Sequence, residues 1–474
     1  MRKTKIICTL GPASNTRKII RELALAGMNV ARFNFSHGTH ASHYALFQEL
    51  LYVRNELARP IAAILDTKGP EIRIRDFKDG QVTLVEGQTF TLTTRDVEGD
   101  ANIVSVTYKD LPHDLGDKSR ILVDDGLIEL AIESMTDTDV ICRVVSGGEL
   151  GSRKGINLPG THISMPYISQ QDKEDILFGI RTGFDYIAAS FVRSKDDVLE
   201  LRRLLSENGG EHVNIMSKIE NPDGVKNIHE IIEASDAIMV ARGDMGVEIP
   251  LEDVPVIQKY IIKEARMAGK QVVTATQMLE SMVRNPRPTR AEATDVANAI
   301  YDGTSVIMLS GETANGKYPV EVVRTMARIA ERAEQDIDYA KRFYEQSGKD
   351  LEWNVRDAIS YATCSIAYNL KATAIITVTK SGVTARMISR FRPTMPIIAC
   401  TPSAETQRQL SLSWGVEALM VGEERVTDIL FDQAVNAAKR AGLIKDDDIV
   451  VLTAGVPLAR SGTTNMIKVV KVGE

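Results

Sequence analysis

Cysteines and long apolar runs are both scarce in this sequence. The four cysteines lie far apart and form no C-x-x-C pair, which argues against a disulfide framework and against a cysteine zinc site. They are Cys8, Cys142, Cys364 and Cys400. Apolar runs such as residues 62–65 stop far short of the ~18 residues that a membrane span requires. We therefore expect reduced core cysteines and no membrane-spanning helix.

An excess of positive charge is also absent. The chain has 57 Lys and Arg residues against 64 Asp and Glu residues, for a formal net charge of -7. Electrostatics therefore give no reason to expect nucleic acid or an anionic membrane surface as a partner. The apolar stretch that follows the basic residues near the amino terminus is too short for the core of a signal peptide. We expect a cytoplasmic protein.

Short apolar runs rich in β-branched residues recur along the first two thirds of the chain, and most are followed by an amphipathic segment of helix length. This rhythm is typical of βα units, and eight of them make a barrel. The eight runs are residues 5–9, 29–33, 62–66, 186–191, 214–219, 237–241, 271–276 and 306–310. The third and fourth begin 124 residues apart, whereas one unit takes about 30 residues. The difference predicts an insertion of roughly 95 residues after the third strand.

The inserted segment and the chain beyond the barrel have different patterns. Alternating apolar residues at 82–84, 90–92, 121–123 and 128–132, with a turn signal at Asp125-Gly126, predict an all-β module that could close as a lid. A long helix over residues 320–344 is expected before four further strands, at 375–379, 397–401, 418–421 and 449–453. The expected fold class is α/β, a (β/α)8 TIM barrel with an inserted β domain and a carboxyl-terminal α/β domain. The expected boundaries are residues 1–69 and 167–344, 70–166, and 345–474.

Polar residues gather at the predicted carboxyl ends of the barrel strands, where (β/α)8 barrels place their chemistry. Five strand ends show polar residues two apart, a spacing that puts both side chains on one face. The pairs begin at Arg32, Asp66, Lys218, Arg242 and Ser310. Together the ends supply cations (Arg32, Lys218, Arg242), carboxylates (Asp66, Glu220, Asp244) and hydroxyls (Ser36, Thr67, Thr276, Ser310). Acidic oxygens without a His or Cys cluster suit Mg²⁺ or Mn²⁺, and the neighbouring cations suit a phosphorylated or carboxylated substrate.

Other catalytic patterns find little support. No G-x-S-x-G occurs, and His37 is the only histidine at a predicted strand end, so nucleophilic triad chemistry is not indicated. Residues 311–318 match a phosphate-binding loop until the last position, where Tyr318 replaces the required Ser or Thr. A nucleotide would therefore need a different surface.

Eight motifs, in order, resemble those of the pyruvate kinase family from Thr4 to the carboxyl end. They are KIICTLGP at 5–12, RFNFSHG at 32–38, DTKGPEIR at 66–73, KGINLPG at 154–160, KIEN at 218–221, MVARGD at 239–244, TATQM at 274–278 and MLSGET at 308–313. The resemblance implies phosphoryl transfer from phosphoenolpyruvate to ADP, giving pyruvate and ATP, the last step of glycolysis. It also implies the same domain layout that the spacing predicts.

The resemblance assigns roles to residues of the barrel mouth. Glu220 and Asp244 would hold the divalent ion, Mg²⁺ or Mn²⁺. Lys218 and Arg32 would contact the transferring phosphate, with Lys218 stabilising its transition state. The backbone at Gly243 and Asp244 would bind the substrate carboxylate. Thr276, together with Ser310, is the candidate proton relay to the enolate.

The same resemblance implies a monovalent cation and a nucleotide site. Asn34, Ser36, Asp66 and Thr67 match the family's potassium site, and Glu71 stands where potassium-dependent members have Glu. The nucleotide would contact Arg73 and Lys154 at the two junctions of the inserted domain, beside Asn34, Phe35, Ser36 and His37. Asn315 replaces a lysine found in several relatives, and whether Lys317 substitutes for it stays open.

A loop in the carboxyl-terminal domain has the composition of a phosphate cradle. Thr379, Lys380, Ser381, Gly382 and Thr384 follow a predicted strand and precede a helix. An ordinary strand-to-helix turn would have the same spacing, but the resemblance favours an effector site for a sugar phosphate or AMP, with residues 461–465 as a second wall. It also implies a homotetramer.

Two other functions stay open. One is a metal-dependent aldolase or lyase acting on pyruvate-like substrates, which would not need the β insertion, Arg73 or Lys154. The other is a non-catalytic sugar-phosphate sensor, which would not need Lys218, Glu220 and Asp244.

Overall fold

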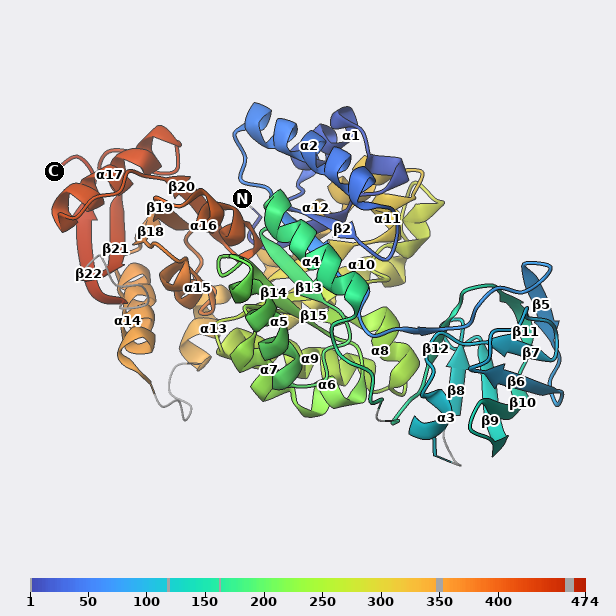
Figure 1. Ribbon diagram of the computed structural model, residues 1–474. Helices are drawn as coiled ribbons and strands as arrows, with labels where there is room; N and C mark the ends of the chain where they lie inside the picture. The colour runs from blue at the N-terminus through green and yellow to red at the C-terminus, as the bar shows by residue number, and fades with distance from the viewer. Residues whose placement is uncertain (1, 117–119, 162, 347–352, 457–463) are drawn as a thin grey trace.

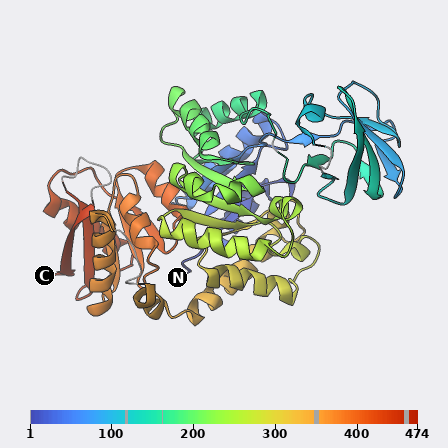
Figure 2. The same cartoon turned by 90° about the horizontal axis from the view of Figure 1, so that it is seen from below.

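The computed structural model describes residues 2–116, 120–161, 163–346, 353–456 and 464–474, and these form three bodies. A barrel lies in the middle, the inserted domain projects from one end and the carboxyl-terminal domain packs at the opposite end (Figure 1). A view turned by 90° shows the same order, with the barrel separating the other two bodies (Figure 2). Within the described residues, no helix combines the length and the apolar character that a membrane crossing requires.

All eight apolar runs predicted as barrel strands form strands. They are β1 (Lys5–Thr9), β2 (Val30–Asn34), β3 (Ala62–Asp66), β13 (Tyr186–Ala189), β14 (Asn214–Ile219), β15 (Ala237–Ala241), β16 (Gln271–Ala275) and β17 (Val306–Leu309). They pair in parallel in the order β1-β17-β16-β15-β14-β13-β3-β2 and close on themselves. Because sequential strands are neighbours, their carboxyl ends converge at one mouth.

Helices surround the barrel, and the pleat of each strand divides the core into two layers. The covering helices are α1 (Arg17–Ala26), α2 (His40–Leu57), α4 (Gln170–Thr182), α5 (Lys195–Glu207), α7 (Ile228–Ala234), α9 (Val254–Met267), α10 (Arg290–Asp302) and α12 (Pro319–Asp336). In β1, Ile7 points into the barrel, whereas Ile6 and Cys8 join the layer under the helices. Both layers are closed to water, so the barrel is a packed scaffold for its mouth.

Short helices stand directly at several strand ends or in the loops between the longer elements. They are η1 (Pro12–Ser14), α6 (Pro222–Lys226), α8 (Arg242–Glu248), η2 (Glu280–Val283) and α11 (Gly311–Ala314). Helix α8 begins at the residue after β15 ends, and α11 begins two residues after β17 ends, so the two-residue alternation of a strand stops there. This matters for the side chains of Arg242 and Glu312, described below.

The inserted segment is an all-β module, as its alternation predicts. Its elements are β4 (Ile72–Arg73), β5 (Gln81–Leu84), β6 (Thr89–Thr93), β7 (Ile103–Ser105), α3 (Leu111–Asp114), β8 (Arg120–Val123), β9 (Ile128–Met135), β10 (Asp139–Ser146), β11 (Gly148–Gly151) and β12 (Gly155–Asn157). Seven strands form one sheet in the order β4-β12-β8-β9-β10-β6-β7, and β5 pairs with β11. Asp124, Asp125 and Gly126, all at positive φ, make the turn between β8 and β9.

The carboxyl-terminal domain is a five-stranded sheet with the order β20-β19-β18-β21-β22. Its strands are β18 (Ala374–Val378), β19 (Ile397–Thr401), β20 (Val416–Met420), β21 (Ile449–Gly455) and β22 (Thr464–Lys471), and its helices are α14 (Val355–Asn369), α15 (Val383–Ser389), α16 (Ala404–Gln409), η3 (Leu410–Leu412) and α17 (Thr427–Arg440). The last strand, β22, is antiparallel to β21 and was not among the four predicted strands.

The predicted long helix over residues 320–344 is wrong in one respect, because two helices occupy this region. Helix α12 ends at Asp336, and α13 (Tyr339–Gln346) begins after a break at Ile337 and Asp338. Ile337 has an extended backbone and is buried in the barrel core, while the Asp338 carboxylate accepts the amide of Lys341 at 2.9 Å. A buried apolar side chain and a helix cap at adjacent positions explain the break.

Candidate active site

Arg32, Asp66 and Lys218 form a buried charge network at the mouth of the barrel, on the strands β2, β3 and β14. Nε of Arg32 donates to Oδ2 of Asp66 at 2.7 Å, and Nζ of Lys218 donates to Oδ1 of the same carboxylate at 3.2 Å. Burial alone would raise the pKa of Asp66, but the two cations outweigh burial and hold this pKa below its ordinary value. Asp66 therefore stays ionised and fixes both cations.

Lys218 lies between two carboxylates. Its Nζ is 3.0 Å from Oε1 of Glu220 as well as 3.2 Å from Asp66. Burial favours the neutral amine, yet the charges of Asp66, Glu220 and Asp244 raise the pKa of Lys218 above its usual value. The side chain is therefore a fixed ammonium, which is the state that a phosphoryl-stabilising cation needs.

Glu220 has the properties expected of a ligand for a cation. It is fully buried, Oε2 accepts the amide of Phe191 at 2.6 Å, and Oε1 lies 3.0 Å from Nζ of Lys218. Burial raises the pKa of Glu220 to about 8, against the effect of Lys218, and the charge of Asp244 adds to the rise. A cation bound by Glu220 and Asp244 would relieve the repulsion between these two carboxylates.

The donor set around Glu220 and Asp244 also fits the kind of metal that the sequence predicts. In the described part of the chain, no three His, Cys, Asp or Glu side chains come together as a complete metal cage. Mg²⁺ commonly binds one or two carboxylates and takes its remaining ligands from substrate oxygens and water. Two carboxylates at an open mouth match that requirement.

Thr276 and Gly243 are joined by a hydrogen bond at the entrance of α8. The amide of Gly243 donates to Oγ1 of Thr276 at 2.8 Å, and Thr276 has a positive φ of 66°. A β-branched residue at positive φ is strained, and such strain is found at functional sites. Ser310 is near the end of β17, and its buried Oγ has no hydrogen-bond partner among the described residues.

In two of the five predicted strand-end pairs, one of the two side chains does not face the mouth. Arg242 pairs with Asp295 at 2.8 Å and donates to the carbonyl of Thr276 at 2.7 Å, so it braces the barrel wall. Glu312 is fully buried and accepts the amides of Leu279 and Ser310. Each residue lies within a helix that starts one or two residues after its strand ends, and helical geometry overrides the alternation assumed for these ends.

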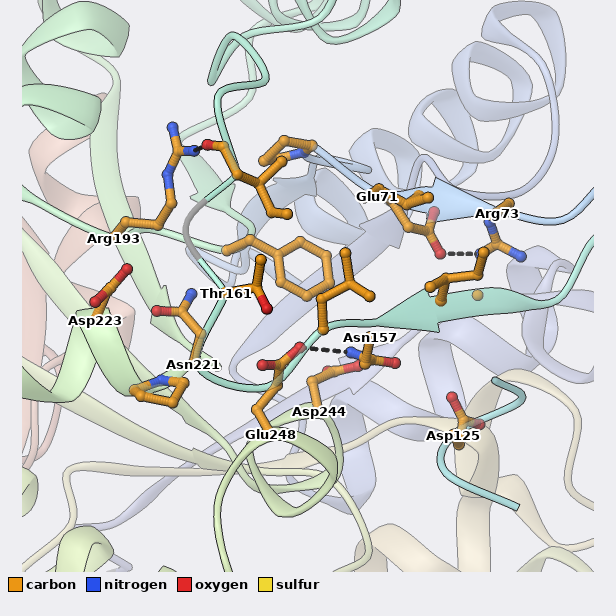
Figure 3. A pocket seen from close by; sticks show the side chains of 18 of the residues that line it. Glu71, Arg73, Asp125, Asn157, Thr161, Arg193, Asn221, Asp223, Asp244 and Glu248 are labelled. Carbon is orange, nitrogen blue, oxygen red and sulfur yellow. Dashed lines mark hydrogen bonds and ion pairs between the residues drawn. The ribbon is translucent and has the colours of Figure 1, made fainter. Parts of the chain in front are cut away.

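A cavity of about 590 Å³ lies between the mouth and the inserted domain, with polar side chains from both (Figure 3). Asp244 and Glu248 enter it from α8, and Asn157 enters it from β12, where its Nδ2 donates to Oε1 of Glu248 at 2.9 Å. The predicted nucleotide residues Arg73 and Lys154 line the same cavity. Its volume is in the range of small-molecule sites.

The predicted nucleotide residues differ in whether their side chains line the cavity. Arg73 forms an ion pair with Glu71, and Lys154 pairs with Asp124 at 2.8 Å, so both cations are held at the cavity rim. His37 also lines the cavity. The side chain of Phe35, by contrast, is buried and stacks on His43 with ring centroids 4.0 Å apart. The side chain of Phe35 therefore belongs to the core layer under the helices.

The predicted potassium donors come from the neighbouring ends of β2 and β3. They are Asn34, Ser36, Asp66 and Thr67. Asn34 and Asp66 are register partners, and Oδ1 of Asn34 accepts the amide of Ser36 at 3.1 Å. Oxygen donors with one negative charge suit a hard cation of low charge. A cation there would share Asp66 with Arg32 and Lys218.

The predicted effector loop, residues 379–384, joins β18 to α15. Gly382 has a φ of +77°, and its amide donates to Oγ1 of Thr379 at 3.0 Å, which curls the loop around its own backbone. Thr384 shares a hydrogen bond of 2.7 Å with Thr464 on β22, and Lys380 is exposed. Of the predicted second wall, residues 461–463 lie outside the described residues.

Sequence reasoning missed several polar residues that the structure brings to the site. Ser190, directly after β13, accepts a hydrogen bond from Lys218 at 2.7 Å. Asn157 and Glu248 meet across the cavity. Ser190 could have been found, because it is the polar residue at the end of the fourth barrel strand. Asn315 and Lys317, whose roles stay open, are both exposed.

Comparisons with known proteins cover nearly the whole chain. The family model described as "Pyruvate kinase, barrel domain" matches residues 1–323, and "Pyruvate kinase, alpha/beta domain" matches residues 357–470. A pyruvate kinase of Clostridium acetobutylicum is 51% identical over 470 residues, with 99% of each chain covered. One of Geobacillus stearothermophilus is 49% identical over 99% of this chain and 80% of its own length. A solved pyruvate kinase of Cryptosporidium parvum superposes with a TM-score of 0.93 at 40% identity, covering 99% of this chain and 96% of the other. The chain belongs to the pyruvate kinase family.

Proposed function

We propose that this protein transfers the phosphoryl group of phosphoenolpyruvate to ADP at the barrel mouth, forming pyruvate and ATP. The supporting observation is the position of Lys218, a buried ammonium held between Asp66 and Glu220 below a cavity that Arg73 and Lys154 line. An anionic donor and an anionic acceptor can both be bound there by cations. A family of this kind uses a divalent metal, and Glu220 and Asp244 are the residues that would hold it, as Mg²⁺ or Mn²⁺.

In this proposal the chain's own residues position the substrate and stabilise charge. Lys218 and Arg32 bind the phosphoryl group from the barrel side, and Lys218 stabilises the charge that develops on its oxygens during transfer. The bond from phosphorus to the enol oxygen breaks as the ADP oxygen bonds to phosphorus. The metal, when bound, neutralises negative charge on substrate oxygens. Carbon 3 of the enolate then takes a proton, for which Thr276 and Ser310 are the candidate relay.

The backbone at Gly243 and Asp244 is proposed to bind the substrate carboxylate, in place of the hydroxyl of Thr276 that Gly243 now contacts. The nucleotide is proposed to bind along Arg73, Lys154 and His37, with Asn34 and Ser36 beside it. Closure of the inserted residues 70–166 over the cavity would exclude water from the phosphoryl donor.

Potassium, an effector and a quaternary structure complete the proposal. Asn34, Ser36, Asp66 and Thr67 would hold K⁺. Residues 379–384 of a regulatory domain spanning 345–474 would bind a phosphorylated effector, a sugar phosphate or AMP. The protein would act as a cytoplasmic homotetramer. These points are supported by the family resemblance and by the oxygen-rich composition of the two loops.

The test is a coupled assay of pyruvate formation from phosphoenolpyruvate and ADP. Turnover is expected with Mg²⁺ or Mn²⁺ and K⁺, to be lost when the divalent ion is chelated, and to fall when Na⁺ replaces K⁺. An absence of pyruvate with either monovalent salt would overturn the proposed function. Pyruvate release that does not require ADP would indicate the lyase alternative.

A further inference from the structure

Ser190 occupies a fixed position beside the reactive lysine. It follows β13 directly and is 2% exposed. Its hydroxyl donates to the carbonyl of Thr67 at 2.7 Å, while its amide donates to Oγ1 of Thr67 at 3.2 Å. A Cβ added to Gly69 would come within 2.9 Å of the Cβ of Ser190, so the backbone on that side leaves no space for movement. Ser190 is therefore held by two hydrogen bonds and by packing.

The hydroxyl oxygen of Ser190 is an acceptor for Lys218. Because the hydroxyl proton goes to Thr67, an oxygen lone pair is left for the ammonium, and Nζ of Lys218 donates to it at 2.7 Å. The other two partners of Nζ are the carboxylates of Asp66 and Glu220. Nζ thus donates hydrogen bonds to Ser190 and Asp66 and forms an ion pair with Glu220.

A neutral acceptor at this position has a physical advantage. A third carboxylate would hold Lys218 as firmly but would add negative charge where an anionic phosphoryl group has to bind. A hydroxyl directs the ammonium without cancelling its charge. Asp66 also pairs with Arg32, and Glu220 is the proposed metal ligand, so Ser190 is the partner whose hydrogen bond to Lys218 is not shared with another cation.

Phe191, the residue after Ser190, also holds a functional side chain of the site in place. Phe191 has a φ of 54°, an unfavourable conformation for a bulky side chain, and its amide donates to Oε2 of Glu220 at 2.6 Å. Strained backbone persists where surrounding contacts require it. Two consecutive residues thus contact the two functional groups of the motif at 218–220, one through its side chain and the other through its backbone.

We propose that Ser190 is a positioning residue, which holds the ammonium of Lys218 in the direction of the transferring phosphoryl group. This inference rests on the proposed role of Lys218 in phosphoryl transfer. The proposal predicts a lower kcat, which reports on the chemical step, because Ser190 contacts Lys218 and not the substrate.

The test compares Ser190→Ala with Ser217→Ala. Ser217 is equally buried, precedes Lys218 on β14 and bonds to Ser235 at 2.6 Å, away from the lysine. Ser190→Ala is expected to lower kcat about tenfold, with KM for both substrates changed by less than about twofold. Ser217→Ala is expected to leave kcat within about twofold, although both variants should lose similar thermal stability. Equal kcat values for the two variants would overturn the proposal.

A double variant separates positioning from a general structural effect. If Ser190 acts through Lys218, adding Ser190→Ala to Lys218→Met should change kcat by no more than about twofold. A further tenfold loss would show that Ser190 acts independently and would overturn the inference. A wild-type protein without pyruvate-forming activity would refute the proposed function itself. Normal wild-type turnover with an undiminished Ser190→Ala would refute the inference alone.

Discussion

Two lysines lie at the carboxyl ends of buried parallel strands in this protein, Lys218 within β14 and Lys380 in the loop after β18, and their surroundings are opposite. Lys218, at the barrel mouth, is 8% exposed and is contacted by two carboxylates and a hydroxyl. Lys380, in the loop after β18, has a side chain that is 64% exposed and lies 3.4 Å from Glu423, itself 76% exposed. Charge pairs are strong where water is excluded and weak where it is present. The same residue type is thus rigid in one place and adaptable in the other.

This difference matches the two kinds of work proposed for the two regions. A cation that stabilises a transition state must already be in place, because reorganisation during the reaction costs rate. A loop that binds a ligand reversibly can use backbone amides, hydroxyls and a glycine at positive φ, with a lysine that adjusts on binding. The burial of Lys218 and the exposure of Lys380 therefore agree with the two kinds of work proposed for them.

Removal of the ammonium from the buried site should have the largest effect. Lys218→Met is expected to lower kcat by at least ~100-fold with little change in KM, because a preorganised contact to the transition state is lost. Steady-state kinetics of pyruvate formation give both constants. Lys5→Met is the matched control, since Lys5 is 3% exposed at the opposite end of the barrel and donates to the carbonyl of Val416. A loss confined to KM would assign Lys218 to ground-state binding.

Ion pairs should show the same contrast in stability. Asp185 is 2% exposed and joins the barrel to α16 through Nε of Arg408 at 2.8 Å, so Asp185→Ala removes a buried carboxylate that pairs with two partly buried arginines, Arg408 and Arg54. We expect a loss of about 3 kcal/mol in the free energy of unfolding. For the exposed pair, Glu423→Ala should change it by less than about 0.5 kcal/mol.

Urea denaturation of the two variants measures these free energies. Equal values for Asp185→Ala and Glu423→Ala would contradict the claim that burial strengthens ion pairs in this protein. Because the chain has several domains, the unfolding transition should first be shown to coincide in fluorescence and circular dichroism.

The smallest expected effect concerns regulation. Thr384→Ala removes a hydroxyl of the proposed phosphate cradle and its bond to Thr464. The ratio of turnover with a phosphorylated effector to turnover without it should fall to about one. Titration with sugar phosphates and with AMP measures this ratio. Thr363→Ala is the control, because Thr363 is a buried threonine of the same domain whose hydroxyl donates to the carbonyl of Ile359 in the same helix, α14. Activation that survives in Thr384→Ala would exclude the loop.

Much of the barrel could be predicted because its signals are local. Runs such as residues 62–65 and 237–241 are apolar over their whole length, as is typical of strands buried on both faces, and the spacing of the runs shows one unit after another. The turn at Asp125 and Gly126 likewise depends on its own residues. The break at Ile337 was missed because it depends on a docking contact with the barrel core.

The candidate site was predictable to the extent that strand ends meet at a mouth. Arg32, Asp66 and Lys218 do converge there. The failure at Arg242 and Glu312 has a local cause, since helices begin too early for strand alternation to continue. Ser190 and the contact of Asn157 with Glu248 depend on which strands become neighbours and on how the inserted domain packs. The spacing of residues along the chain predicts neither of these contacts.

The sequence by itself determined the order of strands and helices, the place of the insertion and the residue types at each strand end, because burial and periodicity act over a few neighbouring residues. Only the tertiary structure decided how those residues act on one another. Whether Asp66 holds two cations, and whether Lys218 remains an ammonium, depends on groups that lie from 34 to 152 positions apart along the chain. Their interaction is strong because closing the barrel removes water around them, and no residue can do that alone.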